Sequence, residues 1–344
     1  MSRLRAAVIG AGQIARRAHL PGYVRAGVPV VALCDLPGAD LDALAGEFGV
    51  ARLYHDWRQM LADGGFDVVS VCTPPALHAA MTVEAARRGY SVLVEKPMAL
   101  TVAECDAMIE AADAAGVTLM VAHNQRYIAH HQQAKALLDS GRLSRVYLAH
   151  AVIGHSGPEH WSPAGRWYFQ AEQAGPGALA DLGSHKIDLL CWLLGQRVIE
   201  IAALGAAFEK AAVFDTVACL LRFDGSALAT LHASWAFHPG WENSLVLRCE
   251  RGTLIVPTDL REPVRLLEDG ADGPRESAYP AATDNDSAGW LATMAAFVQA
   301  VAQGGPAPIS GAEGRAVIAN MEAAYTALVS GAPARLDNEI RSVE

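Results

Sequence analysis

The first third of the chain alternates short apolar runs with stretches in which apolar residues recur every three or four positions. The runs, rich in β-branched residues, predict strands, and the stretches predict helices, because the two structures repeat every 2 and 3.6 residues. Gly89 and Gly116 follow two of the predicted helices, as C-caps do. The strands are Ala6–Ile9, Val28–Leu33, Val68–Cys72, Ser91–Val94 and Val117–Val121, and two of the helices are His78–Arg88 and Ala103–Ala115. This alternation predicts a doubly wound parallel sheet.

The pattern changes after about Asn124. Longer runs that alternate polar with apolar residues follow one another without helices between them, which predicts a mostly antiparallel sheet with helices at one side. The composition of Asp269–Ala288 predicts an irregular surface loop, and Ser310 is the expected N-cap of the last helix. The predicted strands are Arg145–Val152, Val198–Phe208, Thr216–Phe223, Ala227–Phe237 and Ser244–Val256, with hairpin turns at Asp224-Gly225 and Arg251-Gly252, and the helices are Ala288–Gln303 and Ala312–Leu328. We therefore predict an α/β protein with a boundary between residues 123 and 124.

Composition and charge narrow the range of partners. The chain has 344 residues, of which 52% are hydrophobic, enough for two compact cores. A formal net charge of −10 argues against binding to nucleic acid or to an anionic membrane surface. The longest apolar runs fall short of the ~20 residues that a membrane span needs, and the first run is too short for a signal peptide. Six widely spaced cysteines without a CxxC pair suit a reducing compartment, so we expect a cytoplasmic protein.

A glycine motif follows the first predicted strand and opens a helix. In Gly10-Ala11-Gly12-Gln13-Ile14-Ala15, Gly10 permits a tight turn, Gly12 lets the backbone approach a pyrophosphate, and Ala15 allows close packing. Asp35 ends the second strand, where a carboxylate accepts hydrogen bonds from ribose hydroxyls and repels a 2′-phosphate. An ordinary strand-to-helix turn is the alternative. The strand, the helix and the acid at the expected distance together predict that residues 1–123 form a dinucleotide-binding Rossmann domain and that the cofactor is NAD.

A lysine follows the buried strand Ser91–Val94, in the sequence Val94-Glu95-Lys96-Pro97. Ligands of open α/β sheets bind at the carboxyl ends of the strands, and Pro97 fixes the direction of the chain there. The alternative is a solvated lysine paired with Glu95. We favour a functional role for Lys96, because it lies at the same sheet edge as the glycine motif.

Asp181 and His185 lie four residues apart in a predicted helix that leads into the apolar run Leu189–Leu194. This spacing places both on one helix face, where a carboxylate orients an imidazole and raises its basicity, as a general base requires. One alternative is a surface pair that merely supports the helix. Another is a metal site, which would need a third ligand from among His150, His155 and His160. We expect a general base and no metal.

Taken together, these motifs carry a family resemblance. They are the glycine motif, Thr73-Pro74-Pro75 with His78, Glu95-Lys96-Pro97, and the stretch from Gly177 through Asp181-Leu182-Gly183 to His185 and Asp188. In this order they resemble the glucose-fructose oxidoreductase, inositol dehydrogenase and MocA (Gfo/Idh/MocA) family over the whole chain. Pro176 replaces one glycine of the usual run, which affects local loop geometry. The resemblance implies an active site between the Rossmann domain and an α+β domain (residues 124–344) with a large open-faced sheet that binds substrate and forms a homodimer or homotetramer.

The resemblance also implies an activity and a set of site residues. Lys96, Asp181 and His185 match the catalytic lysine, aspartate and histidine of the family. We therefore expect a hydride to pass between nicotinamide and a hydroxyl carbon of a sugar, glycoside or cyclitol, with His185 as acid and base and Lys96 stabilising the oxygen. Asp181 would orient the base or bind a neighbouring hydroxyl. The expected cofactor-binding residues are Gly10, Gly12, Gln13, Ile14, Asp35, Thr73, Pro74, His78, Glu95 and Lys96.

The substrate pocket is less well defined by sequence. Aromatic faces and imidazoles suit a small polyhydroxylated ring, so we expect it to be contacted by Asn124, Arg126, Tyr127, His155 and Trp167 as well as by the three catalytic residues. Loop packing is an equally good interpretation of Trp161 and Trp167. Two other functions stay open: an NAD-dependent enzyme that cleaves glycosides through transient oxidation, and a non-catalytic sensor of NAD or sugar.

Overall fold

The computed structural model describes residues 4–37, 41–162, 165–280, 286 and 288–336. The chain forms two compact units. The first contains Met1–Tyr127, Glu172–Ala174 and Ala288–Ile318, and the second contains Ile128–Ala171, Gly175–Ser287 and Ala319–Glu344. The chain thus returns to the first unit near its C-terminal end.

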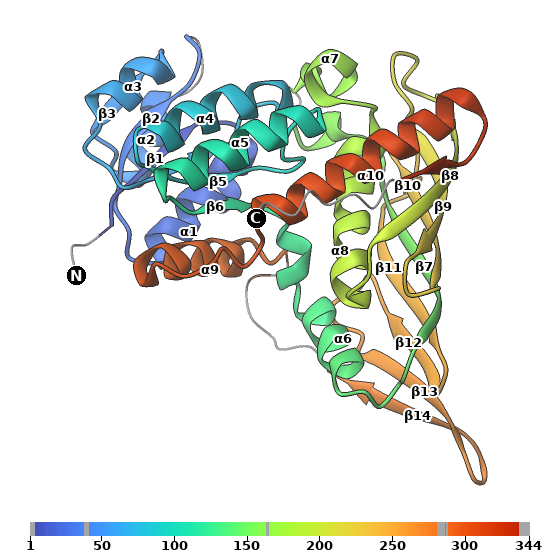
Figure 1. Cartoon of the computed structure of the whole chain (residues 1–344). Coiled ribbons are helices and arrows are strands. Elements are labelled where there is room, and N and C mark those ends of the chain that lie inside the picture. The colour runs from blue at the N-terminus through green and yellow to red at the C-terminus, as the bar shows by residue number, and fades with distance from the viewer. Residues whose placement is uncertain (1–3, 38–40, 163–164, 281–285, 287, 337–344) are drawn as a thin grey trace. The chain divides into compact units, whose positions relative to one another are not determined.

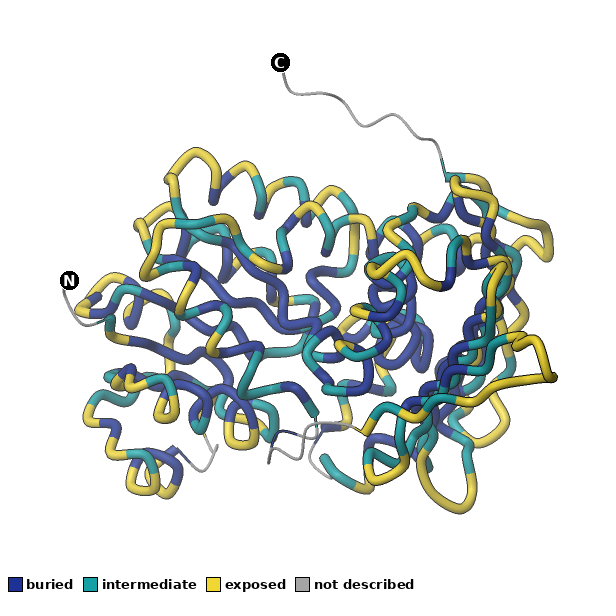
Figure 2. The backbone as a smooth tube through the Cα atoms, turned by 90° about the horizontal axis from the view of Figure 1, so that it is seen from below, coloured by how far each residue is buried: buried dark blue, intermediate teal, exposed yellow. Residues whose placement is uncertain are grey.

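The first unit is built on a parallel sheet. Six strands of the described chain pair in the order β3-β2-β1-β4-β5-β6: β1 (Ala6–Ile9), β2 (Val30–Cys34), β3 (Arg52–Tyr54), β4 (Val68–Val71), β5 (Ser91–Val94) and β6 (Leu119–Val121). Residues of β1, β4 and β5 are buried throughout, as the dark central tubes of Figure 2 show, because helices cover both faces. This confirms the predicted fold class. The three-residue, half-buried edge strand β3 has too short an apolar pattern to stand out in the sequence.

Helices complete the first unit. Figure 1 shows α4 and α5 on one face of the parallel sheet and α1 and α9 on the other. Gly22 lets α1 approach α9, since a Cβ atom there would lie 2.3 Å from Met294 Cγ. Gly116 ends α5 in the left-handed conformation (φ +64°), as predicted. The helices are α1 (Leu20–Arg25), α2 (Leu41–Phe48), α3 (Trp57–Asp63), α4 (His78–Arg87), α5 (Val102–Ala115) and α9 (Trp290–Gln303).

The second unit is built on a large sheet, in the order β14-β13-β12-β11-β7-β10-β9-β8-β15. Its pairs are antiparallel except for β7 with β10. The helices α6 (Ala129–Asp139) and α8 (Ser184–Leu194) lie along one face (Figure 1). The strands are β7 (Val146–His155), β8 (Val198–Ala206), β9 (Thr216–Phe223), β10 (Leu228–Ser234), β11 (Trp241–Cys249), β12 (Gly252–Val256), β13 (Val264–Gly270), β14 (Gly273–Tyr279) and β15 (Ala334–Arg335).

The face of this sheet opposite α8 carries the more exposed side chains. Residues of β9 alternate strictly, with Val217, Cys219 and Leu221 buried and Ala218 and Leu220 exposed. The predicted alternation of polar and apolar positions is therefore confirmed, although the exposed positions include leucine.

The loop predicted over Asp269–Ala288 is wrong in its first half. Residues of β13 and β14 form an antiparallel hairpin, in which Glu268 pairs with Arg275 and Gly270 with Gly273. The strand β14 is the edge of the sheet, and an edge strand tolerates Pro274 because its outward-facing N–H groups have no ladder partner. Its side chains are mostly exposed, so it lacks the apolar alternation that marks the other strands. Residues 281–285 and 287 of the predicted loop lie outside the described residues.

The last long helix begins as the sequence predicts. The side chain of Ser310 accepts a hydrogen bond from Glu313 N (3.2 Å), and Glu313 Oε2 accepts one from Ser310 N (2.8 Å). This reciprocal pair is a capping box, and it starts α10 (Gly311–Ser330). The short helix α7 spans Ala171–Ala174.

Candidate functional site

The glycine motif lies in the first unit, where β1 leads into a helix. Gly10 adopts φ +92°, and a Cβ atom there would lie 2.6 Å from Cys72 O, so a larger residue would be strained and would clash. Around Gly12 the space is open, since a Cβ atom would meet no described atom within 4 Å. Ala15 is fully buried. The loop therefore has the close turn, the open approach and the close packing that a dinucleotide pyrophosphate requires.

Asp35 follows β2 and holds the glycine loop. Its Oδ2 atom accepts a hydrogen bond from Ala11 N (2.7 Å), and its Oδ1 atom accepts one from Leu36 N (2.6 Å). A carboxylate has about four lone-pair sites, so two ribose hydroxyls can still donate to it. The negative charge beside the loop fits NAD, whereas the 2′-phosphate of NADP would be repelled.

Lys96 follows β5 through Glu95. The side chain of Lys96 is half-buried, and its backbone N–H donates to Glu95 Oε2 (3.2 Å). Glu95 itself is buried. The lysine therefore leaves the end of a buried strand, on a backbone that an adjacent carboxylate fixes.

His78 connects two loops at the same edge of the parallel sheet. Its ring is fully buried, with Nε2 2.7 Å from Thr73 O and Nδ1 3.0 Å from Pro97 O. Burial lowers the pKa of His78, although these carbonyl contacts and Glu95 oppose that shift. Because no part of this ring is exposed, its contribution to a cofactor site would be to hold the Thr73 and Pro97 loops in place.

Asn124 and Arg126 follow β6 and contact the returning C-terminal segment within the first unit. Asn124 Nδ2 donates to Ala288 O (2.7 Å), and Arg126 Nη1 lies 2.6 Å from Glu313 Oε1. Although burial would raise the pKa of Glu313, Arg126 and Ser310 outweigh it, so this pKa is lowered. The Arg126 side chain is only 6% exposed, so its charge is largely engaged in holding residues 288–318.

Asp181 and His185 lie in the second unit, where a wide π-type turn over Leu179–Gly183 leads into α8. Such turns often occur at functional sites. The turn follows Gly177, which adopts φ +62° and leaves no room for a side chain, since a Cβ atom there would lie 2.3 Å from Phe214 O. Gly183 approaches Leu179 closely, because a Cβ atom on it would lie 2.9 Å from Leu179 Cδ1.

The carboxylate of Asp181 is buried and is held by a tryptophan from a distant part of the chain. Trp235, fully buried just after β10, donates its Nε1 hydrogen to Asp181 Oδ2 (3.1 Å). His155, at the end of β7, has its Nε2 atom 4.0 Å from the same oxygen. The structure thus brings Asp181 and His155 together and adds Trp235, which only the tertiary fold could identify.

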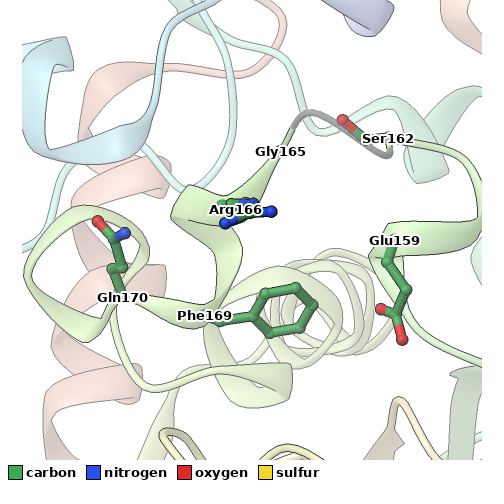
Figure 3. A pocket seen from close by; sticks show the side chains of 6 residues that line it. All are labelled: Glu159, Ser162, Gly165, Arg166, Phe169 and Gln170. Carbon is green, nitrogen blue, oxygen red and sulfur yellow. The ribbon is translucent and has the colours of Figure 1, made fainter.

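Aromatic side chains extend from Trp235. The ring of Tyr168 stacks on Trp167 (3.7 Å between centroids) and meets Trp235 edge-on (6.4 Å). Phe169 also packs edge-on against Trp235 (5.9 Å). Next to these rings is a pocket of about 450 Å³ (Figure 3), which is lined by Glu159, Ser162, Gly165, Arg166, Phe169 and Gln170. In the segment that contains Trp167, some side chains therefore pack against other rings and others line the pocket.

Lys186 is a further buried polar residue that the sequence did not single out. It follows His185 in α8, is fully buried, and donates from Nζ to Ser244 O (3.3 Å). Burial lowers the pKa of Lys186 to about 7, although Glu242 opposes the shift. A helix side chain directed at the sheet in this way anchors α8 against β11.

Three further features bear on the predicted chemistry. Within the described residues, no group of three His, Cys, Asp or Glu side chains could hold a metal ion. All six cysteines lie in the described ranges and are thiols rather than disulfides. Across the same part of the chain, no helix has the length and apolar character needed to cross a membrane.

Residues 4–123 match a model described as an oxidoreductase family with an NAD-binding Rossmann fold, and residues 131–255 match the GFO/IDH/MocA C-terminal domain. The 1,5-anhydro-D-fructose reductase of Ensifer adhaerens is 30% identical over 331 residues, which cover 88% of this chain and 97% of the relative. The D-glucoside 3-dehydrogenase of Escherichia coli (strain K12) is 33% identical over 196 residues, 56% of this chain and 55% of that protein.

The match to the D-glucoside 3-dehydrogenase spans only about half of that protein's length, whereas the match to the 1,5-anhydro-D-fructose reductase is nearly complete. Among solved structures, an oxidoreductase from Agrobacterium radiobacter in complex with NAD+, L-tartaric acid and magnesium is 25% identical, with a TM-score of 0.84 over 97% of this chain and 98% of that one. Both units of the chain therefore have relatives with the same architecture.

Proposed function

Because this chain belongs to the GFO/IDH/MocA family of oxidoreductases, with an NAD-binding Rossmann fold in its first part, we propose that it is a dehydrogenase of polyhydroxylated substrates. It transfers a hydride between nicotinamide and a hydroxyl-bearing carbon of a sugar, glycoside or cyclitol. The observation that carries this proposal is the nearly full-length match to a protein named as a reductase of an anhydro sugar. Accumulation of NADH with such substrates tests it.

The catalytic roles follow from the chemistry of three side chains. NAD, when bound, supplies the carbon that accepts or returns the hydride. His185 takes the proton from the substrate hydroxyl during oxidation and returns it to the oxygen during reduction. Lys96 donates a hydrogen bond to this oxygen and stabilises the negative charge that develops on it. Asp181, held by Trp235, orients the base or binds a neighbouring hydroxyl.

Residues 1–123 bind NAD through the glycine loop, Asp35 and the loops that His78 joins, and residues 124–344 bind substrate. Leu204 and Leu220 are 77% and 50% exposed on the open sheet, and leucines on a regular sheet face favour association. We propose a homodimer or homotetramer formed through this face, in the cytoplasm, where the six thiols stay reduced.

Replacing Asp35 with alanine should weaken the preference for NAD over NADP. The variant loses the acceptor for the ribose hydroxyls and the charge that repels a 2′-phosphate, so the ratio of kcat/KM for the two cofactors should fall roughly tenfold or more. Steady-state kinetics with both cofactors measures this ratio, with Asp113→Ala, an exposed position in α5, as the control. An unchanged ratio in Asp35→Ala would show that cofactor choice lies elsewhere.

Replacing Trp235 with phenylalanine should impair turnover through Asp181. The change keeps most of the buried ring but removes the N–H donor, and a hydrogen bond to a charged group is worth about 1.5–3 kcal/mol. We expect kcat/KM to fall roughly tenfold to a hundredfold. Trp57→Phe, in the first unit, is the matched control. If Trp235→Phe turns over substrate at the wild-type rate, Trp235 has no role in positioning Asp181.

A further inference from the structure

A chain of four polar side chains lies buried within the first unit, behind the backbone of Lys96. His19 Nε2 is 2.9 Å from Glu95 Oε1, and His19 Nδ1 is 2.9 Å from Ser70 Oγ. Tyr23 Oη lies 2.8 Å from the same Ser70 oxygen. His19, Ser70 and Tyr23 are at most 1% exposed, and Glu95 is 9% exposed. These four hydrogen-bonded side chains therefore link three separate parts of the unit: the helix after the glycine loop, β4 and the end of β5.

The chemistry of these groups gives most of the hydrogen bonds a direction. A carboxylate accepts only, so Nε2 of His19 donates to Glu95, while the backbone N–H of Lys96 donates to the other carboxylate oxygen. The Ser70 hydroxyl lies between His19 Nδ1 and Tyr23 Oη, and it can accept a hydrogen bond from the Tyr23 hydroxyl. Burial raises the pKa of Tyr23, which keeps this donor protonated. Both oxygens of Glu95 therefore have a donor.

Glu95 is ionised because of its partners. Burial alone would raise its pKa, but the hydrogen bond and charge of His19, together with the charge and backbone N–H of Lys96, outweigh burial, and the pKa is lowered. The Glu95 charge also acts on other neighbours: burial raises the pKa of the Cys72 thiol and the Glu95 charge adds to that shift, and the same charge opposes the lowering of the His78 pKa. Among the described residues, His19 and Lys96 lower the pKa of Glu95, and the Glu95 charge in turn acts on Cys72 and His78.

We propose that His19 is a positioning residue for Lys96: it keeps Glu95 ionised and fixed, and Glu95 in turn fixes the lysine at the end of β5. This inference rests on the role proposed for Lys96 in catalysis. A simple structural link between helix and strand would contribute to stability alone. A positioning role adds a dependence of activity on pH, because loss of the His19 donor leaves a buried carboxyl whose pKa rises.

Two amide substitutions separate these roles. The amide nitrogen of glutamine can take the place of His19 Nε2 and donate to Glu95, whereas the shorter asparagine reaches only the position of Nδ1, near Ser70. In His19→Asn the pKa of Glu95 should rise, since buried glutamates reach values of about 8–9. A carboxyl is neutral below its pKa, so kcat/KM of this variant should fall about tenfold or more from about pH 8 to about pH 6, relative to wild type over the same range. His19→Gln should restore the wild-type profile.

A spectroscopic measurement reports on Glu95 without any turnover. Infrared difference spectra between the same two pH values should show the band of a protonated carboxyl in His19→Asn, and not in wild type or His19→Gln. The band should vanish in His19→Asn combined with Glu95→Gln, which assigns it. His238→Asn is the matched control, because His238 makes a 2.9 Å contact with Glu209 in an exposed part of the second unit.

The outcomes distinguish this inference from the proposed function. A folded His19→Asn with the wild-type pH profile and no carboxyl band would overturn the role of His19. If His19→Asn fails to fold, His19→Leu is measured in its place with the same expectations. If Lys96→Ala leaves turnover unchanged, the proposed function of the lysine fails, while the carboxyl band still decides whether His19 controls the ionisation of Glu95.

Discussion

Replacing His185 with alanine should lower kcat by about two to four orders of magnitude, because a positioned acid or base contributes about that much to a proton transfer. The affinity for NAD should stay close to that of wild type, since the glycine loop and Asp35 belong to the first unit and His185 to the second. Steady-state kinetics and direct titration of NAD measure the two quantities separately. This combination identifies a defect in chemistry rather than in cofactor binding.

The control for this variant is another histidine of the second unit. His238 is 52% exposed and pairs with Glu209, so His238→Ala should keep its turnover and its affinity for NAD. A His185→Ala enzyme that turns over as fast as wild type would contradict the assignment of the base. A variant that also loses NAD would place His185 in the cofactor site instead.

Replacing Lys96 with alanine should lower kcat/KM by about two to three orders of magnitude. Removal of one donor from an oxygen on which charge develops typically costs about this much. The loss should appear mainly in kcat, because the interaction strengthens as the charge develops. Lys135→Ala is the matched control, since Lys135 forms an i,i+4 ion pair with Asp139 in α6 and such pairs contribute little.

The effect of the Lys96 substitution on KM separates two roles. If kcat is unchanged and KM alone rises, Lys96 binds ground state and transition state equally and does not stabilise the developing charge. If both parameters stay at wild-type values, Lys96 is a solvated lysine at a strand end, which is the alternative that the sequence left open.

The parallel sheet and its ligand loop could be predicted because their signals are local. The glycine motif, the acid at Asp35 and the capping glycine Gly116 each act within a few residues of their own position, and the structure places them as expected after β1, after β2 and at the end of α5. By contrast, β14 is stabilised by pairing with β13 and has little pattern of its own. The sequence of this edge strand, with its exposed side chains, therefore predicts a loop instead of a strand.

The partners of the candidate site residues could not be predicted, because they come from distant parts of the chain. Trp235 is 54 residues from Asp181, and His19 is 76 residues from Glu95. Sequence spacing predicts that two residues share a helix face, as for Asp181 and His185, but it cannot show which side chain a buried carboxylate meets after the strands have paired. In the same way, the sequence predicted that Arg126 contacts substrate, but it could not show that Arg126 forms an ion pair with Glu313.

The central claim, that this chain passes a hydride between a polyhydroxylated substrate and nicotinamide with a net change of NAD, is tested most directly by NADH absorbance. The purified protein is incubated with NAD and, in turn, inositols, aldoses and glycosides, with Lys96→Ala in parallel. We expect NADH to accumulate in proportion to substrate consumed with at least one of these compounds, and the variant to be slower by about two orders of magnitude or more. Cleavage of a glycoside without net NADH, or binding of NAD with no turnover of any compound, would contradict the claim.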